Sequence, residues 1–217
     1  MSCRLDSRRA GAGIHRDPDP HHPGGRLVRD LRPVQAVLWP GLIQRVFEIP
    51  ADLHPDCVPL AWLLGRWEGA GVGDYPTIEA FRFGQEIAFT YVPRKPFLAY
   101  SSRSWILDDD GTLVRPAAQE TGYWRPQADG EVEVLLTHPT GFVEIYLGRL
   151  ESAKIEIATR GVLKTETAKD YRAGHRLYGL VGGRLMYVYE MAAMGHELQP
   201  HLSAELQRVA GASDARA

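Results

Sequence analysis

Histidine is the residue type that best equips this chain for chemistry. The sequence contains eight histidines and two cysteines. It contains no nucleophile elbow, P-loop, dinucleotide-binding fingerprint or zinc-spaced Cys/His cluster. Enzymes that work with side chains alone usually show a nucleophile or an acid–base set, and we find no persuasive one. This pattern favours a bound cofactor as the source of any reactivity.

His201 is the sharpest candidate for a cofactor ligand. It follows a loop at 195–200, whose final proline restrains the backbone entering the next element. Neutral imidazole is the common proximal ligand of haem iron, and its ordinary pKa suits that role near neutral pH. Position alone leaves His196, His175 and His138 as equal rivals. A lone histidine is also more often an exposed or satisfied core residue than a ligand.

A second group of histidines, which includes the pair His21 and His22, lies in a segment rich in Arg, Asp, Pro and Gly. Such a composition buries too little apolar surface to offset the entropy of ordering it. We therefore predict that residues 1–45 form a disordered extension with solvated histidines. The folded domain is predicted to span residues 46–210, and residues 211–217 to form a flexible tail.

Charge and cysteine content exclude several classes of partner. The formal net charge of −2 leaves no basic excess that would attract nucleic acid. The cysteines, Cys3 and Cys57, form no Cys-x-x-Cys pair and fit a reducing cytosol. No stretch approaches the roughly 18 apolar residues of a membrane span. We expect a cytoplasmic protein without a nucleic-acid or membrane partner.

The elements that must position these side chains are short strands in series. Apolar runs recur at a spacing of roughly 8–12 residues, separated by turn signals such as those at 108–111 and 181–183. The run at 131–135 alternates polar and apolar residues, which is typical of a sheet with one wet face. This pattern predicts an all-β fold, either a sandwich or a barrel. Hairpin-length connections favour an up-and-down antiparallel β-barrel of the lipocalin or fatty-acid-binding-protein kind, which can enclose one ligand.

The segment that follows His201 is ambiguous from its pattern. Leu202, Leu206 and Val209 satisfy helical spacing, whereas Leu202, Ala204 and Leu206 satisfy strand alternation. In a chain of consecutive strands we favour a final strand that closes the sheet, with His201 at its start.

The stretch at 59–71 marks the beginning of the strand series. Residues 60–64 form an apolar run that predicts a short helix, and Gly65 can end it. A strand is expected to open near Trp67. An indole at the first strand of a barrel usually plugs the closed end and finds a partner for its N–H, so we interpret Trp67 and Trp62 as structural.

From about Phe47 to Val209 the chain resembles the nitrobindins, a family of small haem-binding β-barrels also called peroxynitrite isomerases. The resemblance includes a Gly-x-Trp-x-Gly-x-Gly motif, formed here by Gly65, Trp67, Gly69 and Gly71. The other matching segments, in family order, are 74–78, 120–123, 167–169, 177–180, 190–193 and 198–202. The glycine motif alone is weak, because lipocalin-type barrels share a Gly-x-Trp. The ordered set of segments is specific.

The resemblance implies a ten-stranded barrel that holds one haem b per subunit at an open end. It places the axial iron ligand at His201, within the matched segment 198–202, and leaves His196 as a loop residue. Thr77 matches a haem-pocket position. Lys169 is a further candidate, because its ammonium could pair with a haem propionate; a solvated surface lysine is the alternative.

The resemblance also implies an activity. A ferric iron held by His201 would isomerise peroxynitrite to nitrate and bind nitric oxide reversibly, so the chain would be a haem-dependent peroxynitrite isomerase that scavenges or senses reactive nitrogen species. A lipocalin-like carrier of an apolar small molecule, without haem, is the alternative. The oligomeric state stays open, with a homodimer as one option.

Overall fold

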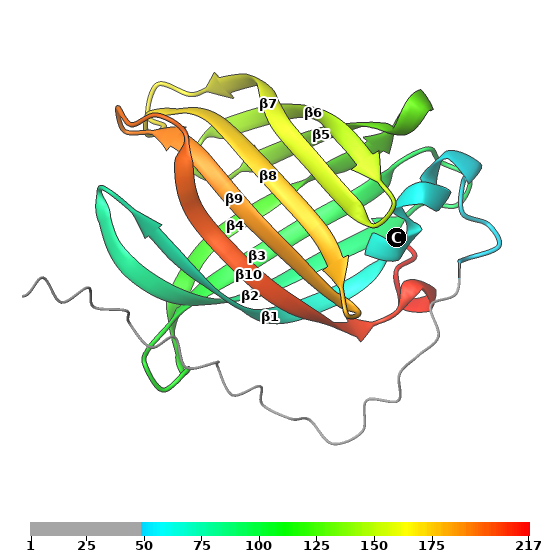
Figure 1. Ribbon diagram of the computed structural model, residues 1–217, viewed down its shortest axis with the longest axis horizontal. Coiled ribbons are helices and arrows are strands. Elements are labelled where there is room, and N and C mark those ends of the chain that lie inside the picture. The colour runs from blue at the N-terminus through cyan, green and yellow to red at the C-terminus, as the bar shows by residue number, and fades with distance from the viewer. Residues whose placement is uncertain (1–48) are drawn as a thin grey trace, which may run out of the picture. The chain divides into compact units, whose positions relative to one another are not determined.

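The computed structural model describes residues 49–217, and these form a closed β-barrel (Figure 1). Ten antiparallel strands pair in sequence order, and β1 closes the barrel on β10. In chain order the strands are β1 (Gly65–Tyr75), β2 (Ile78–Tyr91), β3 (Leu98–Leu107), β4 (Leu113–Pro126), β5 (Glu131–His138), β6 (Phe142–Glu151), β7 (Lys154–Lys164), β8 (Tyr171–Val181), β9 (Arg184–Ala193) and β10 (Gln199–Ala210). The predicted all-β, up-and-down antiparallel barrel is confirmed. The extension predicted over residues 1–45 lies outside the described residues.

Helices in residues 49–217 are short 3₁₀ segments, namely η1 (Pro55–Leu63), η2 (Ala128–Gly130) and η3 (Ala212–Asp214). None is long and apolar enough to cross a membrane. The short helix predicted before the first strand is η1. It begins earlier than predicted, where the ring nitrogen of His54 accepts a hydrogen bond from the amide of Asp56. Gly65 has a φ of 118°, but it belongs to β1, because Leu64 has already turned the chain.

One end of the barrel is closed by η1 and the core beneath it. Leu60 and Leu63 of η1 are fully buried, as is Trp67 of β1. The indole nitrogen of Trp67 donates a hydrogen bond to the carbonyl of Leu63 at 2.7 Å. Arg208 lies over the same indole, with its guanidinium 4.1 Å from the ring centroid. Trp67 therefore plugs the closed end and finds its N–H partner, as predicted, whereas the indole nitrogen of Trp62 is buried without a hydrogen-bond partner in the described residues.

The C-terminal segment 211–217, for which the sequence predicts a flexible tail, contacts the closed end of the barrel in this structure. Ala212 and Ala215 are buried at the closed end. Tyr91 of β2 donates its amide hydrogen to the carbonyl of Ala215 at 2.8 Å and accepts one from the amide of Ala217 at 3.0 Å. Small alanine side chains allow this close approach, and the hydrogen bonds fix the segment against β2.

The opposite end of the barrel carries the connections at 76–77, 108–112, 139–141, 165–170 and 194–198. They gather at one end because successive strands alternate in direction, and most of them lie at the left in Figure 1. The helix η1 lies at the other end, so this end is open. The final strand predicted to close the sheet is β10, and it begins before His201. The register of β10 against β9 shifts between Pro200 and Leu202, which places His201 in a β-bulge.

Candidate functional site

His201 lies half-buried at the open end, where the bulge in β10 directs its imidazole toward the end of β1. Its Nδ1 is 3.0 Å from the carbonyl oxygen of Asp74. A carbonyl can only accept a hydrogen bond, so Nδ1 carries the proton and Nε2 keeps its lone pair. The rings of Tyr75, Tyr189 and Phe81 stand edge-on to the imidazole, with centroids at 5.5, 5.8 and 6.3 Å.

The surroundings of His201 favour its neutral form. Burial lowers the pKa of the imidazole, the hydrogen bond to the carbonyl of Asp74 opposes this, and the positive charge of Arg176 lowers the pKa further. The net shift is downward, so the ring is neutral at physiological pH. Neutral imidazole with a free ring nitrogen is the form that ligates metals.

The other two predicted site residues lie on connections at the same end. Thr77 is exposed in the turn between β1 and β2. Lys169 is exposed in the loop 165–170, between β7 and β8. The sequence predicts a strand from Thr167, but β8 begins at Tyr171, because a turn closed by the hydrogen bond from the Ala168 amide to the Thr165 carbonyl precedes it.

The glycine motif lies at the seam where β1 pairs with β10. A Cβ atom at Gly69 would collide with the carbonyl of Glu205, and one at Gly71 with the carbonyl of Ser203. The missing side chains thus allow close approach of the two backbones, and in this structure the motif shapes the barrel wall.

Two of the rival histidines have ring nitrogens engaged by carboxylates. His175 contacts Glu190 through Nδ1 at 2.9 Å and Glu156 through Nε2 at 3.1 Å. His138 contacts Glu144 through Nε2 at 2.7 Å. The contacts of His175 occupy both nitrogens that a metal could use. His138 keeps Nδ1 and His201 keeps Nε2 without a hydrogen bond to the described part of the chain, but the free nitrogen of His201 lies at the open end.

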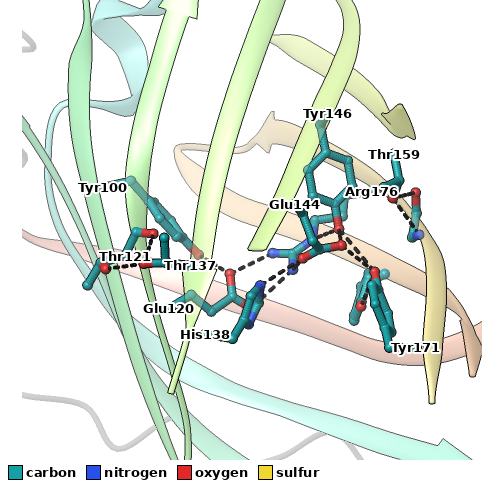
Figure 2. A network of polar contacts seen from close by, with 12 residues as sticks. Tyr100, Glu120, Thr121, Thr137, His138, Glu144, Tyr146, Thr159, Tyr171 and Arg176 are labelled. Carbon is teal, nitrogen blue, oxygen red and sulfur yellow. Dashed lines mark hydrogen bonds and ion pairs between the residues drawn. The ribbon is translucent and has the colours of Figure 1, made fainter. Parts of the chain in front are cut away.

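Below the open end, the barrel interior holds a polar network that the sequence does not predict (Figure 2). Arg176 of β8 is 3% exposed. Its two terminal nitrogens donate to the two carboxylate oxygens of Glu120 on β4, at 2.8 and 3.1 Å. One of them also lies 3.8 Å from the carboxylate of Glu144 on β6. Residues from three strands thus form one buried ionic group.

Glu144 is 1% exposed and is the most enclosed acid of this network. Its Oε1 accepts hydrogen bonds from the hydroxyls of Tyr146, at 2.6 Å, and Tyr171. Burial alone would raise the pKa of Glu144, but the hydrogen bond from His138, the charge of Arg176 and the two tyrosine hydroxyls lower it below its ordinary value. The folded barrel therefore stabilises the carboxylate form.

This carboxylate gives the fold a pH dependence with a defined sign. The unfolded chain titrates Glu144 near its ordinary pKa of 4.5, and the folded chain titrates it lower. The stabilisation is therefore complete above about pH 4.5 and is lost as the pH falls through the folded pKa of Glu144.

In urea unfolding between pH 7 and pH 3, Glu144→Gln should be less stable than wild type at pH 7 and should lose less stability on acidification. Glu166→Gln, at an exposed loop position, is the control and should follow wild type; parallel losses in wild type and Glu144→Gln would contradict the assignment.

Further polar groups of the interior line a cavity beside this network. Tyr187 donates to Gln85 at 2.6 Å, and Gln85 donates to Ser102 at 2.8 Å. The cavity between these groups measures about 30 Å³. That volume holds one or two water molecules.

A closed ten-stranded meander, plugged at one end and carrying a half-buried histidine at the other, defines a β-barrel domain with a candidate ligand site at its mouth. A family model described as "THAP4-like, heme-binding beta-barrel domain" matches residues 56–208. The chain belongs to this family of haem-binding barrels, the nitrobindin family.

Relatives and a solved structure agree with this membership. A peroxynitrite isomerase of Nocardioides sp. is 57% identical over 162 residues, covering 75% of this chain and 98% of the relative. A ferric nitrobindin-like protein of Streptomyces griseus is 48% identical over 166 residues, covering 76% and 87%. The crystal structure of Rv2717c from M. tuberculosis is similar with a TM-score of 0.65 and 38% identity, covering 72% of this chain and 99% of that one. The resemblance to the nitrobindins is confirmed.

Proposed function

We propose that this chain is a haem-dependent peroxynitrite isomerase that converts peroxynitrite to nitrate and binds nitric oxide reversibly. The observation that carries the proposal is His201, a neutral, half-buried imidazole at the open end whose Nε2 keeps a free lone pair. Membership in a haem-binding family supports the cofactor. Relatives named peroxynitrite isomerase at 50–57% identity support the reaction.

The residues of the open end fit a haem by their chemistry. His201 would hold the iron through Nε2, while its Nδ1–H bond to the Asp74 carbonyl fixes the ring orientation and raises the basicity of the ligand. Thr77 and Lys169, on two connections of the same end, would contact the haem b, the lysine through a propionate. When bound, ferric haem supplies the Lewis-acid chemistry for the rearrangement.

The chain's own contribution is to keep the imidazole oriented and neutral. The rings of Tyr75, Phe81 and Tyr189 enclose the sides of His201 and restrict water around it. Because burial lowers the pKa of His201, protonation does not compete with ligation near pH 7. The chain needs to donate no proton, since peroxynitrite and nitrate are isomeric anions.

The interior argues against the alternative, a carrier of an apolar molecule without haem. A cavity of about 30 Å³ is far smaller than the several hundred Å³ of ordinary ligand pockets. Arg176 is the one buried cation of the interior network that could attract a ligand carboxylate. It already forms a bidentate ion pair with Glu120. An acyl chain inside the barrel would have to displace buried, hydrogen-bonded groups.

The test is an absorption titration of the purified chain with haemin, followed by addition of nitric oxide. We expect a saturable Soret band at one haem per chain, a reversible shift with nitric oxide, and faster peroxynitrite decay in stopped flow for the haem-loaded chain only. A chain that stays colourless after haemin addition and binds a fluorescent fatty acid would instead establish the carrier.

A further inference from the structure

Tyr171 has an unusual position in the interior network. It is 5% exposed and opens β8, directly after the loop 165–170 of the open end. Its hydroxyl donates to the carboxylate of Glu144 and accepts a hydrogen bond from Tyr189 at 2.9 Å. The ring of Tyr189 in turn stands 5.8 Å from the ring of His201. A short chain of aromatic groups thus connects the proposed iron ligand with a phenol that is bonded to a base (Figure 2 shows the Tyr171–Glu144 contact).

We propose that Tyr171 and Glu144 form a redox site, in which Tyr171 gives one electron to a strong one-electron oxidant at the open end and gives its proton to Glu144. The oxidant class is that of nitrogen dioxide, the radical released when the O–O bond of peroxynitrite breaks homolytically. The origin of the oxidant rests on the proposed function, whereas the site itself rests on the geometry of the chain.

The step balances in atoms and charge. The O–H bond of Tyr171 breaks, its proton forms a new O–H bond with Oε1 of Glu144, and the electron reduces nitrogen dioxide to nitrite. The reactants are the neutral phenol, the carboxylate of Glu144 and neutral nitrogen dioxide, so they carry a single negative charge. The products are a neutral phenoxyl radical, a neutral carboxylic acid and the nitrite anion, which carry the same single negative charge. A reductant of the thiol or ascorbate class would restore the phenol.

The site needs a nearby base, because a neutral phenol cannot be oxidised easily unless its proton leaves at the same time. Burial raises the pKa of Tyr171 far above its ordinary value, so ionisation of the phenol does not precede the step. Glu144 supplies the acceptor at hydrogen-bond distance. Counting Arg176, Glu120 and Glu144, the network holds two carboxylates against one guanidinium. Protonation of Glu144 removes the excess negative charge and leaves the Arg176–Glu120 pair intact.

The surroundings distinguish Tyr171 from Tyr146, which shares its base, and from Tyr189, which donates to it. The guanidinium of Arg176 lies 4.4 Å from the ring centroid of Tyr189 and 5.3 Å from that of Tyr146. A cation over a ring makes removal of an electron harder. In the described residues no such contact occurs at Tyr171, whose ring instead stacks on Phe142 at 4.7 Å. Of these three tyrosines, Tyr171 is therefore the one from which an electron is removed most easily, although Tyr146 shares the same base.

The test uses the haem-free chain, so it stands or fails separately from the proposed isomerase activity. Photogenerated tris(bipyridine)ruthenium(III) serves as the one-electron oxidant, and freeze-quench electron paramagnetic resonance detects the radical. Wild type should give a tyrosyl signal, identified by incorporation of ring-deuterated tyrosine. Tyr171→Phe should reduce the signal that survives at a fixed delay at least tenfold, and Tyr146→Phe should leave it within twofold.

Glu144→Gln keeps every tyrosine but removes the proton acceptor, so it should reduce the surviving signal as much as Tyr171→Phe does. This second variant keeps the test open if one substitution unfolds the barrel, which circular dichroism would reveal. Tyr123→Phe, at a position that is 51% exposed, controls for radicals on the surface. A signal that disappears in Tyr123→Phe or Tyr146→Phe, or persists in both Tyr171→Phe and Glu144→Gln, would overturn the proposal.

Discussion

His201→Ala is expected to leave a folded barrel that no longer shows the native Soret position with haemin and no longer accelerates peroxynitrite decay. The substitution removes the imidazole whose Nε2 is free at the open end and whose Nδ1 is fixed by the Asp74 carbonyl. Loss of an outer-shell partner of a metal ligand typically costs 10–100-fold in metal affinity, so loss of the ligand itself should weaken haemin binding by about 100-fold or more. The decay rate should fall to that of free haemin at the same concentration.

The matched control is His196→Ala. His196 is half-buried in the loop 194–198 of the same end, and its ring also stands edge-on to Tyr75, at 5.8 Å. Its removal should change neither the Soret position nor the decay rate. Haemin titrations and stopped-flow decay on both variants, with circular dichroism to establish folding, separate the two histidines. If His201→Ala kept both properties, the ligand would lie elsewhere.

The strand order of this barrel could be predicted because local signals specify it. Turn residues such as Gly182 and Gly183 take positive φ values of 57° and 80° between β8 and β9, where the sequence predicts a hairpin. The segment after His201 fits both helical and strand spacing, but the context favours a strand, because a barrel built of hairpins needs a closing strand; that strand is β10. The contacts of Ala212 and Ala215 with the barrel could not be predicted, because two small buried alanines leave no apolar periodicity in the sequence.

The interior network could not be predicted because it reverses the usual alternation. In β6 the apolar residues Val143 and Ile145 are 38% and 47% exposed, while Glu144 and Tyr146 are 1% and 0% exposed. Alternation alone would place the apolar side chains inside. Glu144 is tolerated inside because His138, two tyrosine hydroxyls and the charge of Arg176 on β8 all meet it there. The pairing with Arg176 depends on the register of distant strands, which no local pattern encodes.

Arg176→Met is expected to destabilise the barrel by about 3–5 kcal/mol at pH 7, because it leaves the buried carboxylate of Glu144 and the half-buried carboxylate of Glu120 without their shared cation. Methionine is also unbranched and apolar, so much of the packing against the ring of Tyr189 should survive. Urea unfolding followed by tryptophan fluorescence measures the loss as a lower midpoint with an unchanged slope. The loss should shrink as the pH falls toward 4, because removing Arg176 takes away one of the causes that lower the pKa of Glu144, and protonation of Glu144 then removes its uncompensated charge.

A second variant distinguishes a charge effect from lost packing. The double variant Arg176→Met/Glu120→Gln removes the guanidinium together with the carboxylate that it binds in bidentate geometry. It should therefore be more stable than Arg176→Met alone by about 1–3 kcal/mol. Arg184→Met, which removes an exposed arginine paired with Glu205, should cost less than about 1 kcal/mol. Equal losses for Arg176→Met and Arg184→Met would mean that water reaches the network and screens it. If burial makes unpaired carboxylates costly, the loss of stability should be largest for Arg176→Met, smaller for the double variant and smallest for Arg184→Met. That order would show that charge pairing specifies the interior of this barrel as much as apolar packing does.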